Sequence, residues 1–343
     1  MFTNIPWLIY GATGRTGTFI AEEAVARGHR PVLAGRDPES VRRLAERLDL
    51  KWVAGPVSDL GTLIGDAQLV LLAAGPFGAT APPALRACLD AGVHYLDIAN
   101  EIPTAEAVLA ADDEARQRGI TVLPAVGFGT VASDGLARHV ADQVPDATRL
   151  DLAVMLETDG SSAGARETTM DVLASGGRVR RDGRIVRARL GAGAHRHATP
   201  VGDRTFVPVP TADLVVSAHT TGVANISVSR PVSMPPMVAE LVMPALPVLA
   251  RASRVLPQRD RTSRSNTKTG TVASYLWARA TAADGRMVEA WARTGEGYAY
   301  TARSAVLAVE ATLQAEPLGA TTVASAFGPE LSFAAGSELV APA

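Results

Sequence analysis

Short apolar runs alternate with segments of helical periodicity along the first third of the chain. The apolar runs predict strands at Ile5–Tyr10, Pro31–Ala34, Lys51–Ala54, Leu69–Ala74, His94–Ile98 and Ile120–Val126. Helical spacing of the apolar positions predicts helices at Thr16–Arg27, Pro38–Leu48, Thr80–Ala91 and Thr104–Arg118. This alternation predicts an α/β fold, in which a doubly wound parallel sheet carries helices on both faces.

The pattern changes after about residue 134. Polar and apolar residues then alternate, as in half-buried strands, at Leu150–Leu156 and Val223–Ser229. Asp182-Gly183 and Asp284-Gly285 predict two hairpins, because Asp-Gly suits a type I′ turn. We expect a dinucleotide-binding domain at residues 1–130, a mostly antiparallel α+β domain for substrate and dimerisation at 131–299, and a C-terminal helical return at 300–343.

Composition and charge narrow the classes of function. The 343 residues include 33 basic and 35 acidic side chains, and the net charge of −2 argues against a nucleic-acid binder. No apolar run is long enough for a membrane span, and no secretion signal is seen, so we expect a cytoplasmic protein. Cys88 is the only cysteine, so we expect no disulfide within the chain and no metal site built on cysteines.

A glycine-rich turn follows the first expected strand and precedes the first expected helix. It has the pattern G-x-x-G-x-x-G, formed by Gly11, Ala12, Thr13, Gly14, Arg15, Thr16 and Gly17. Glycines let the backbone approach a pyrophosphate, which then lies at the positive N-terminus of the helix. Because strand, turn and helix are all in place, we expect a Rossmann dinucleotide-binding site here.

The end of the second expected strand distinguishes NAD from NADP. An NAD site has Asp or Glu about twenty residues beyond the turn, where it binds the ribose 2′-hydroxyl. Gly35 stands at that place, and Arg36 follows it. Arginine pairs well with a 2′-phosphate, and Arg15 is a second cation in the turn. We therefore expect NADP; Asp37 is the acid that would favour NAD if the register is shifted by two residues.

Other candidate site residues follow the later strands, because ligands of open parallel sheets bind beyond the carboxyl ends of the strands. The further candidate cofactor contacts are Ser58, Asp59, Ala74, Gly75, Pro76, Phe77, Asn100 and Phe128. Tyr95 and Asp97, in the fifth expected strand, are candidate catalytic residues. A structural reading of this pair stays open: a core ring, and an acid that caps a helix or forms an ion pair.

Several of these blocks together resemble the saccharopine dehydrogenase-like oxidoreductases, and within them the trans-acting enoyl reductase group. The blocks are Gly11–Gly17, Leu33–Arg36, Ala74–Phe77, His94–Glu101, Pro124–Asp134, Ala212–Ile226 and Gly295–Tyr298. The resemblance implies an NADPH-dependent reductase that transfers hydride to a small or carrier-bound substrate with an enoyl or enone C=C bond, in secondary or lipid metabolism. Two departures concern the substrate: Gly129 stands where the family has an aspartate, and Val228–Arg230 replaces a more aromatic continuation.

Adding hydride to an enone leaves an enolate, which must be stabilised and then protonated. A phenol carries its proton at neutral pH, so Tyr95 and Tyr298 are the candidate proton donors, with water as the alternative. Tyr298 also has a structural reading, as a packing residue that opens the last helix.

Two other functions stay open: reduction of an imine or amino-acid-like substrate, and a non-catalytic NADP-binding scaffold or sensor, because of Gly129.

The small second sheet predicts a homodimer. Pro231–Pro257 is apolar but interrupted by prolines and is a candidate lid over the substrate. Arg251–Arg264 is rich in arginine and is a candidate landing site for an acidic carrier or a CoA phosphate, besides the alternative of an exposed loop.

Overall fold

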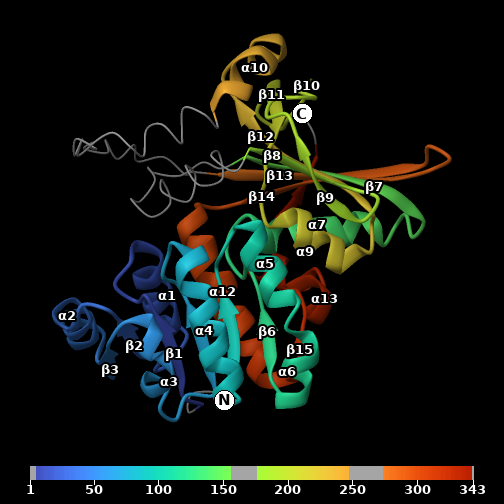
Figure 1. Cartoon of the computed structure of the whole chain (residues 1–343). Coiled ribbons are helices and arrows are strands. Elements are labelled where there is room, and N and C mark those ends of the chain that lie inside the picture. Colours follow the sequence, from blue (N-terminus) through green and yellow to red (C-terminus); the bar gives the residue numbers. More distant parts are fainter. Residues whose placement is uncertain (1–4, 156–175, 247–272, 342–343) are drawn as a thin grey trace. The chain divides into compact units, whose positions relative to one another are not determined.

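The computed structural model describes residues 5–155, 176–246 and 273–341. The chain forms two compact units (Figure 1). Unit 1 comprises Met1–Val131 and Tyr298–Ala335, and unit 2 comprises Ala132–Gly297 and Gly336–Ala343. The chain therefore leaves unit 1 after Val131, returns to it at Tyr298 and leaves it again after Ala335.

Unit 1 is built on a parallel sheet of seven strands with the order β15-β6-β5-β4-β1-β2-β3. Its strands are β1 (Trp7–Tyr10), β2 (Val32–Gly35), β3 (Trp52–Ala54), β4 (Leu69–Leu72), β5 (His94–Asp97), β6 (Thr121–Leu123) and β15 (Gly319–Ala320). All four residues of β1 and of β4 are buried, so both faces of the sheet are covered. The expected doubly wound parallel sheet is confirmed. The strand order reverses between β1 and β4, the point at which such sheets bind ligands.

The helices of unit 1 follow its strands in the expected alternation. They are α1 (Arg15–Ala26), α2 (Pro38–Leu48), α3 (Leu60–Leu63), α4 (Phe77–Ala91), α5 (Ile102–Leu109), α6 (Asp112–Arg118), α12 (Gly297–Ala315), α13 (Val323–Phe327) and α14 (Glu330–Ala334), with the 3-10 turn η1 (Val57–Asp59). Two details of the prediction were wrong. The expected helix Thr104–Arg118 is divided into α5 and α6, and α4 begins at Phe77, which places Pro82 and Pro83 in its second turn rather than its first.

Unit 2 contains a sheet in which all neighbouring strands are antiparallel except the β7–β12 pair. Its strands are β7 (Ala147–Met155), β8 (Gly177–Arg181), β9 (Arg184–Ala188), β10 (His195–His197), β11 (Arg204–Pro208), β12 (Asn225–Val232), β13 (Ser274–Ala282), β14 (Met287–Thr294) and β16 (Glu338–Val340). Its helices are α7 (Thr130–Ala141), which starts at the end of unit 1, α9 (Asp213–Thr221), α10 (Pro236–Val242) and the turn η2 (Met243–Ala245). The expectation of a mostly antiparallel α+β fold is thus confirmed.

Both expected hairpins are present, but their turns differ. In β8–β9, Asp182 and Gly183 have φ values of 46° and 75°, as a type I′ turn requires. In β13–β14 only Gly285 has a positive φ, of 90°, and its N–H donates to the carbonyl of Ala282. The expected type I′ turn at Asp284-Gly285 is therefore wrong, because the turn that forms runs from Ala282 to Gly285.

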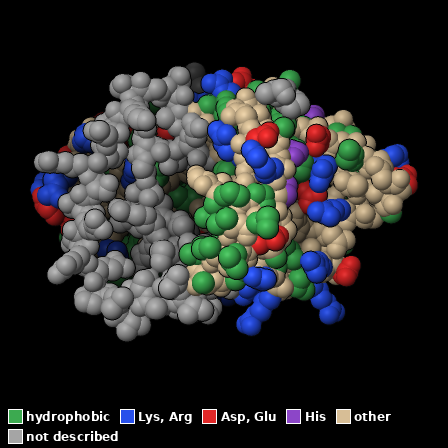
Figure 2. Space-filling view, turned by 90° about the horizontal axis from the view of Figure 1, so that it is seen from above, with side chains coloured by type: hydrophobic (Ala, Val, Ile, Leu, Met, Phe, Trp, Pro, Cys, Tyr) green, Lys and Arg blue, Asp and Glu red, His purple; other side chains and the backbone are tan. Residues whose placement is uncertain are grey.

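The segment proposed as a lid is described only in part. Residues 231–246 form the end of β12, α10 and η2, whereas 247–257 and the whole of Arg251–Arg264 lie outside the described residues. Helix α10 exposes Met237 by 84% and Leu241 by 77%, and Figure 2 shows apolar side chains gathered on the face seen from above. Among the helices that the structure describes, none is long and apolar enough to cross a lipid bilayer.

Candidate functional site

The glycine-rich turn connects β1 to α1 at the carboxyl edge of the parallel sheet. Gly11 has a φ of +90°, and a Cβ atom there would lie 2.6 Å from the backbone nitrogen of Ala74. The N–H groups of Gly11 and Ala12 donate to the carbonyl of Ala34 at 2.9 and 3.1 Å. The turn is therefore tied to the ends of β2 and β4, and only glycine fits its first position.

The N-terminus of α1 suits a phosphate. Its N-cap is Gly14, which has no capping side chain, and the first turn carries no acidic residue. A Cβ atom on Gly17 would lie 2.2 Å from the carbonyl oxygen of Gly11, so this glycine lets the helix pack directly on the turn. Thr13, Gly14 and Arg15 are exposed. This cradle fits the pyrophosphate of a dinucleotide at the positive end of a helix dipole.

The end of β2 favours a 2′-phosphate. Gly35 is buried, and Arg36 is exposed, with no ion pair to any residue that the structure describes. Burial raises the pKa of Tyr10, and the nearby Arg36 opposes that rise. Asp37 does not take the place of the ribose acid, because its carboxylate caps α2: it accepts a hydrogen bond from the N–H of Glu39 at 3.2 Å and one from the hydroxyl of Ser40.

The candidate contacts after β3 and β4 lie at the same edge of the sheet. Ser58 and Asp59 are exposed in η1, and the hydroxyl of Ser58 donates to the Asp59 carboxylate at 3.0 Å. After β4, Ala74 is half-buried, Gly75 and Pro76 are exposed, and Phe77 is in the core. The structure thus brings the exposed residues to the position where a dinucleotide crosses the sheet, whereas the Phe77 side chain packs inward.

Tyr95 and Asp97 form a buried unit at the end of β5. Both have no exposed surface, and the Tyr95 hydroxyl donates to Oδ2 of Asp97 at 2.9 Å. Oδ1 of Asp97 accepts hydrogen bonds from the N–H groups of Ala99 and Ala125, each at 2.9 Å. Burial raises the pKa of both side chains. Asp97 therefore fastens the loop after β5 to the loop after β6, and the structural reading of this pair is the one that the geometry favours.

Asn100 and Glu101 follow directly in the loop that Asp97 holds. Oδ1 of Asn100 is buried and has no hydrogen-bond partner among the described residues, so this acceptor is available to a ligand. The N–H of Asn100 donates to Oε2 of Glu101 at 2.9 Å. Burial raises the pKa of Glu101, although backbone N–H groups, including that of Phe77, oppose the rise. Glu101 was missed in the sequence analysis, where its only signal was an acid that follows an expected strand.

The loop after β6 contacts the start of the C-terminal return. The N–H of Phe128 donates to the hydroxyl of Thr301 at 3.0 Å, and its ring packs edge-on against Tyr300 at 5.6 Å. Gly129 has a φ of 94°, a conformation that favours glycine. The family aspartate expected at this position would be strained in this loop, which gives a physical reason for its replacement.

Tyr298 is the first residue of the return into unit 1, and it is half-buried beside α1. The guanidinium of Arg15 lies over its ring, 4.2 Å from the centroid, and the ring of Phe19 stacks on it at 6.1 Å. The structure thus brings Tyr298 to the phosphate-binding turn, whereas Tyr95 is enclosed in the core. Of the two candidate proton donors, only Tyr298 lies at the surface of unit 1.

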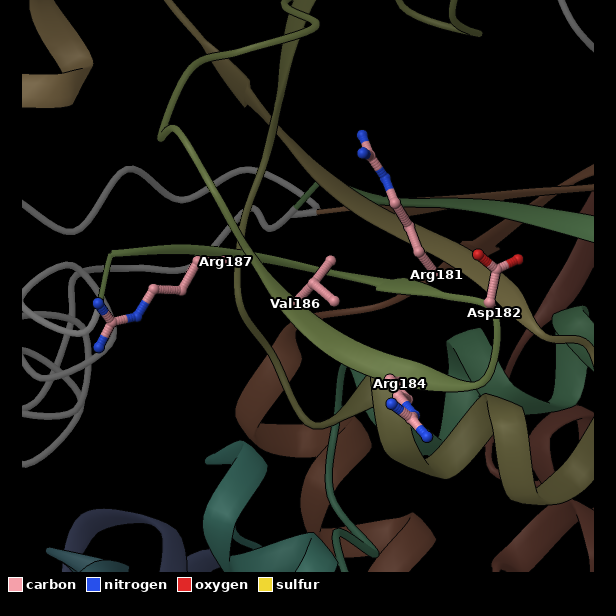
Figure 3. Close-up of a pocket in the computed structure, with 5 residues that line it drawn as sticks. All are labelled: Arg181, Asp182, Arg184, Val186 and Arg187. Carbon is pink, nitrogen blue, oxygen red and sulfur yellow. The ribbon is translucent and has the colours of Figure 1, made fainter.

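A separate concavity lies on the β8–β9 hairpin of unit 2, lined by Arg181, Asp182, Arg184, Val186 and Arg187. Arg181 is directly opposite Arg184, and Arg178 is opposite Arg187, although like charges in such pairs are destabilising. Figure 3 shows the three labelled guanidinium groups pointing in different directions. They do not converge on one point, so the concavity does not enclose a single small anion.

The chain is similar to known proteins mainly through its first part. Residues 7–123 match the model of the saccharopine dehydrogenase NADP binding domain. A probable mitochondrial saccharopine dehydrogenase-like oxidoreductase of Arabidopsis thaliana is 30% identical over an alignment of 187 positions, which covers 46% of this chain and 40% of that protein. A trans-acting enoyl reductase of Mycobacterium ulcerans is 28% identical over an alignment of 144 positions, which covers 39% of this chain and 34% of that protein.

The fold extends the likeness to the whole chain. The apo saccharopine dehydrogenase (L-Glu forming) of Saccharomyces cerevisiae superposes with a TM-score of 0.65 at 13% identity, covering 98% of this chain and 100% of that one. The matched part of the chain spans less than half the length of the two relatives above. The expected resemblance and the expected cofactor, NADP, are confirmed. Residues 7–123 of unit 1 are thus similar to the saccharopine dehydrogenase NADP binding domain.

Proposed function

We propose that this protein is an NADPH-dependent oxidoreductase that reduces the C=C bond of a small or carrier-bound enoyl or enone substrate. The observation that carries the proposal is the glycine cradle at α1 with the unpaired Arg36 beside it. The choice of an enoyl substrate is supported by the name of the Mycobacterium ulcerans relative. When bound, NADPH would supply the hydride that adds to the β carbon; the C=C electron pair would delocalise into the carbonyl as an enolate, and a proton added at the α carbon would complete the reduction.

The chain's own groups supply binding, orientation and the proton. Exposed backbone at Thr13 and Gly14 binds the pyrophosphate, and Arg36 pairs with the 2′-phosphate. The unpartnered Oδ1 of Asn100 is an acceptor for a ribose hydroxyl or the nicotinamide amide. Asp97 holds these loops in place and does not itself reach a ligand.

Two other functions are separated from this one by a single assay. The names of the Arabidopsis and yeast relatives favour reduction of an imine or amino-acid-like substrate, and Gly129 keeps a non-catalytic NADP sensor as a third possibility. NADPH oxidation is followed with a panel of enones, enoyl thioesters and imines. Turnover of the enones or thioesters supports our proposal, and turnover of imines alone supports the second function. NADPH binding without any turnover supports the sensor.

Replacing Arg36 by alanine is expected to weaken NADPH binding and to leave NADH binding nearly unchanged. The lost charged contact is worth about 1.5–3 kcal/mol, or roughly a tenfold to hundredfold change in Kd. Fluorescence titration with both cofactors measures the effect. Arg30→Ala is the matched control, because Arg30 is an exposed arginine that precedes β2 and pairs with Asp49. Equal affinity of the unchanged protein for both cofactors would contradict the proposal.

Replacing Tyr298 by phenylalanine is expected to lower kcat by about 100-fold and to leave NADPH affinity unchanged. Phenylalanine keeps the ring on which Arg15 stacks and removes only the hydroxyl that we assign as proton donor. Tyr298→Ala removes both and is expected to weaken NADPH binding as well. Steady-state kinetics and cofactor titration of the two variants separate these roles. If Tyr298→Phe retains the original kcat, water is the donor.

Unit 2 completes the proposal as the substrate and dimerisation unit. Its exposed apolar helix α10 supports a homodimer, in which such a surface is covered by a second copy of the chain.

A further inference from the structure

Arg230 lies on a face of the unit 2 sheet where its β12 neighbours are apolar, although Arg180 of β8, opposite Ile226, shares that face. Arg230 is in β12, opposite Val207 of β11. Side chains alternate along a strand, so Arg230 shares its face with Ile226 and Val228, which are 2% and 0% exposed. Helix α9 packs against β12. The Arg230 side chain is partly exposed, and burial lowers the pKa of its guanidinium.

This guanidinium has no counter-charge in direct contact. Among the residues that the structure describes, Arg230 forms neither an ion pair nor a hydrogen bond through its side chain. The opposite face of β12 shows the contrast. There the buried Asp151 pairs with Arg149 at 2.9 Å and Arg279 at 3.2 Å, and it accepts a hydrogen bond from Ser227 at 2.6 Å. The buried Asp151 is therefore fully paired, whereas the partly exposed Arg230 is not.

Asp213, at the start of α9, is the acid whose charge opposes the effect of burial and raises the pKa of Arg230. The Asp213 side chain is fully buried, and its two oxygens accept hydrogen bonds from the hydroxyls of Ser133 and Thr211. It does not approach Arg230 within ion-pair distance. These hydroxyls hold the Asp213 carboxylate away from the guanidinium, so the N–H donors of Arg230 remain open.

An unpaired, partly desolvated guanidinium lowers the stability of the folded state, and an apolar side chain of similar size at this position would make the folded state more stable. A guanidinium offers two parallel N–H donors that match a carboxylate. We favour a carboxylate over a phosphate dianion, because Asp213 acts electrostatically on Arg230 and would repel the second negative charge. The three hairpin arginines labelled in Figure 3, Arg181, Arg184 and Arg187, do not converge and offer no such site.

We propose that Arg230 binds a carboxylate group of the substrate, so that unit 2 selects substrates that carry an acid. This inference rests on the proposed reductase function, whose substrate class it narrows. Neither the family match, which ends at residue 123, nor the names of the relatives assign a role to Arg230.

The test compares Arg230→Met with the original protein, both saturated with NADP⁺. Ligand-observed NMR measures the binding of crotonate, its methyl ester and inorganic phosphate. We expect the original protein to bind crotonate but neither of the other two, and the variant to bind crotonate at least about tenfold more weakly. We also expect the midpoint of thermal unfolding to rise in the variant by about 3 °C, because the unpaired charge is gone. Arg204→Met, at an exposed arginine of β11, is the control and should change neither result.

Three results would overturn the inference: no crotonate binding by the original protein, unchanged crotonate binding by Arg230→Met, or a lower unfolding midpoint in that variant. Preference for phosphate over crotonate would overturn the choice of a carboxylate. NADPH affinity is measured in parallel and should be equal in all three proteins. Loss of NADPH binding by the original protein would instead count against the proposed function, so the two failures are distinguishable.

Discussion

Replacing Gly17 by alanine is expected to weaken NADPH binding by about 10- to 100-fold. The new Cβ atom would lie 2.2 Å from the carbonyl oxygen of Gly11 and 2.9 Å from the Cα of Ala12, and both are backbone atoms that cannot rotate away. The turn must therefore move off the helix N-terminus. Overpacking of this kind costs about 1–3 kcal/mol, and here the displaced atoms are those that would hold the pyrophosphate.

The matched control is Gly61→Ala. Gly61 is also helical, in α3, but a Cβ atom there meets nothing within 4 Å. NADPH titration and thermal unfolding are measured for both variants, so that a folded protein without affinity is distinguished from an unfolded one. An unchanged NADPH affinity in a folded Gly17→Ala protein would show that the pyrophosphate does not lie on this turn.

The first unit was largely predictable because its local signals agree with its fold. Strands that are buried on both faces, such as β1 and β4, leave an uninterrupted apolar run in the sequence, and Gly92 and Gly119 end α4 and α6. The division of the helix at residue 110 carried no such signal. The seventh strand, β15, has only two residues and is formed by a segment that returns nearly two hundred residues later.

The second unit was less predictable where one of its strands is short and polar. The strand His195–His197 carries three polar side chains, a composition that is atypical of strands. Its place depends on partners far along the chain: the ring of His197 packs 4.6 Å from that of Trp277 and 5.9 Å from that of Trp291. No pattern of local periodicity contains that information.

The candidate site shows the same limit at the level of single residues. The pattern of expected strands and helices predicted the glycine-rich turn, Arg36 and the loop residues after each strand as candidate cofactor contacts. It could not show that Asp37 caps α2, nor that Asp97 faces inward, because these roles depend on which donors surround each carboxylate. One donor to Asp97 is the N–H of Ala125, which lies 28 residues further along the chain.

Removing the Asp97 carboxylate is expected to have the largest effect on stability. Asp97→Ala leaves the N–H groups of Ala99 and Ala125 and the hydroxyl of Tyr95 without their acceptor in the core. Together these losses are expected to lower the free energy of unfolding by about 3–5 kcal/mol. NADPH affinity should fall as well, because the loops after β5 and β6 lose their common anchor. Tyr95→Phe removes only one donor and should cost about 1 kcal/mol, with kcat unchanged.

Asp97→Asn tests whether geometry or charge provides this anchor. Its Oδ1 can accept from Ala99 and Ala125 as before, and its amide can donate to the Tyr95 hydroxyl, so we expect the folded structure and NADPH affinity to be retained. Burial raises the pKa of Asp97 in the folded protein above its unfolded value. The folded state therefore binds the proton more tightly, and ionisation of Asp97 lowers stability as pH rises from the ordinary carboxyl pKa to the raised one. Asparagine has no such loss, so its stability relative to the original protein should increase across that pH window. Chemical denaturation at a series of pH values measures this difference, and a constant difference would show that the Asp97 carboxylate ionises in the core at no cost.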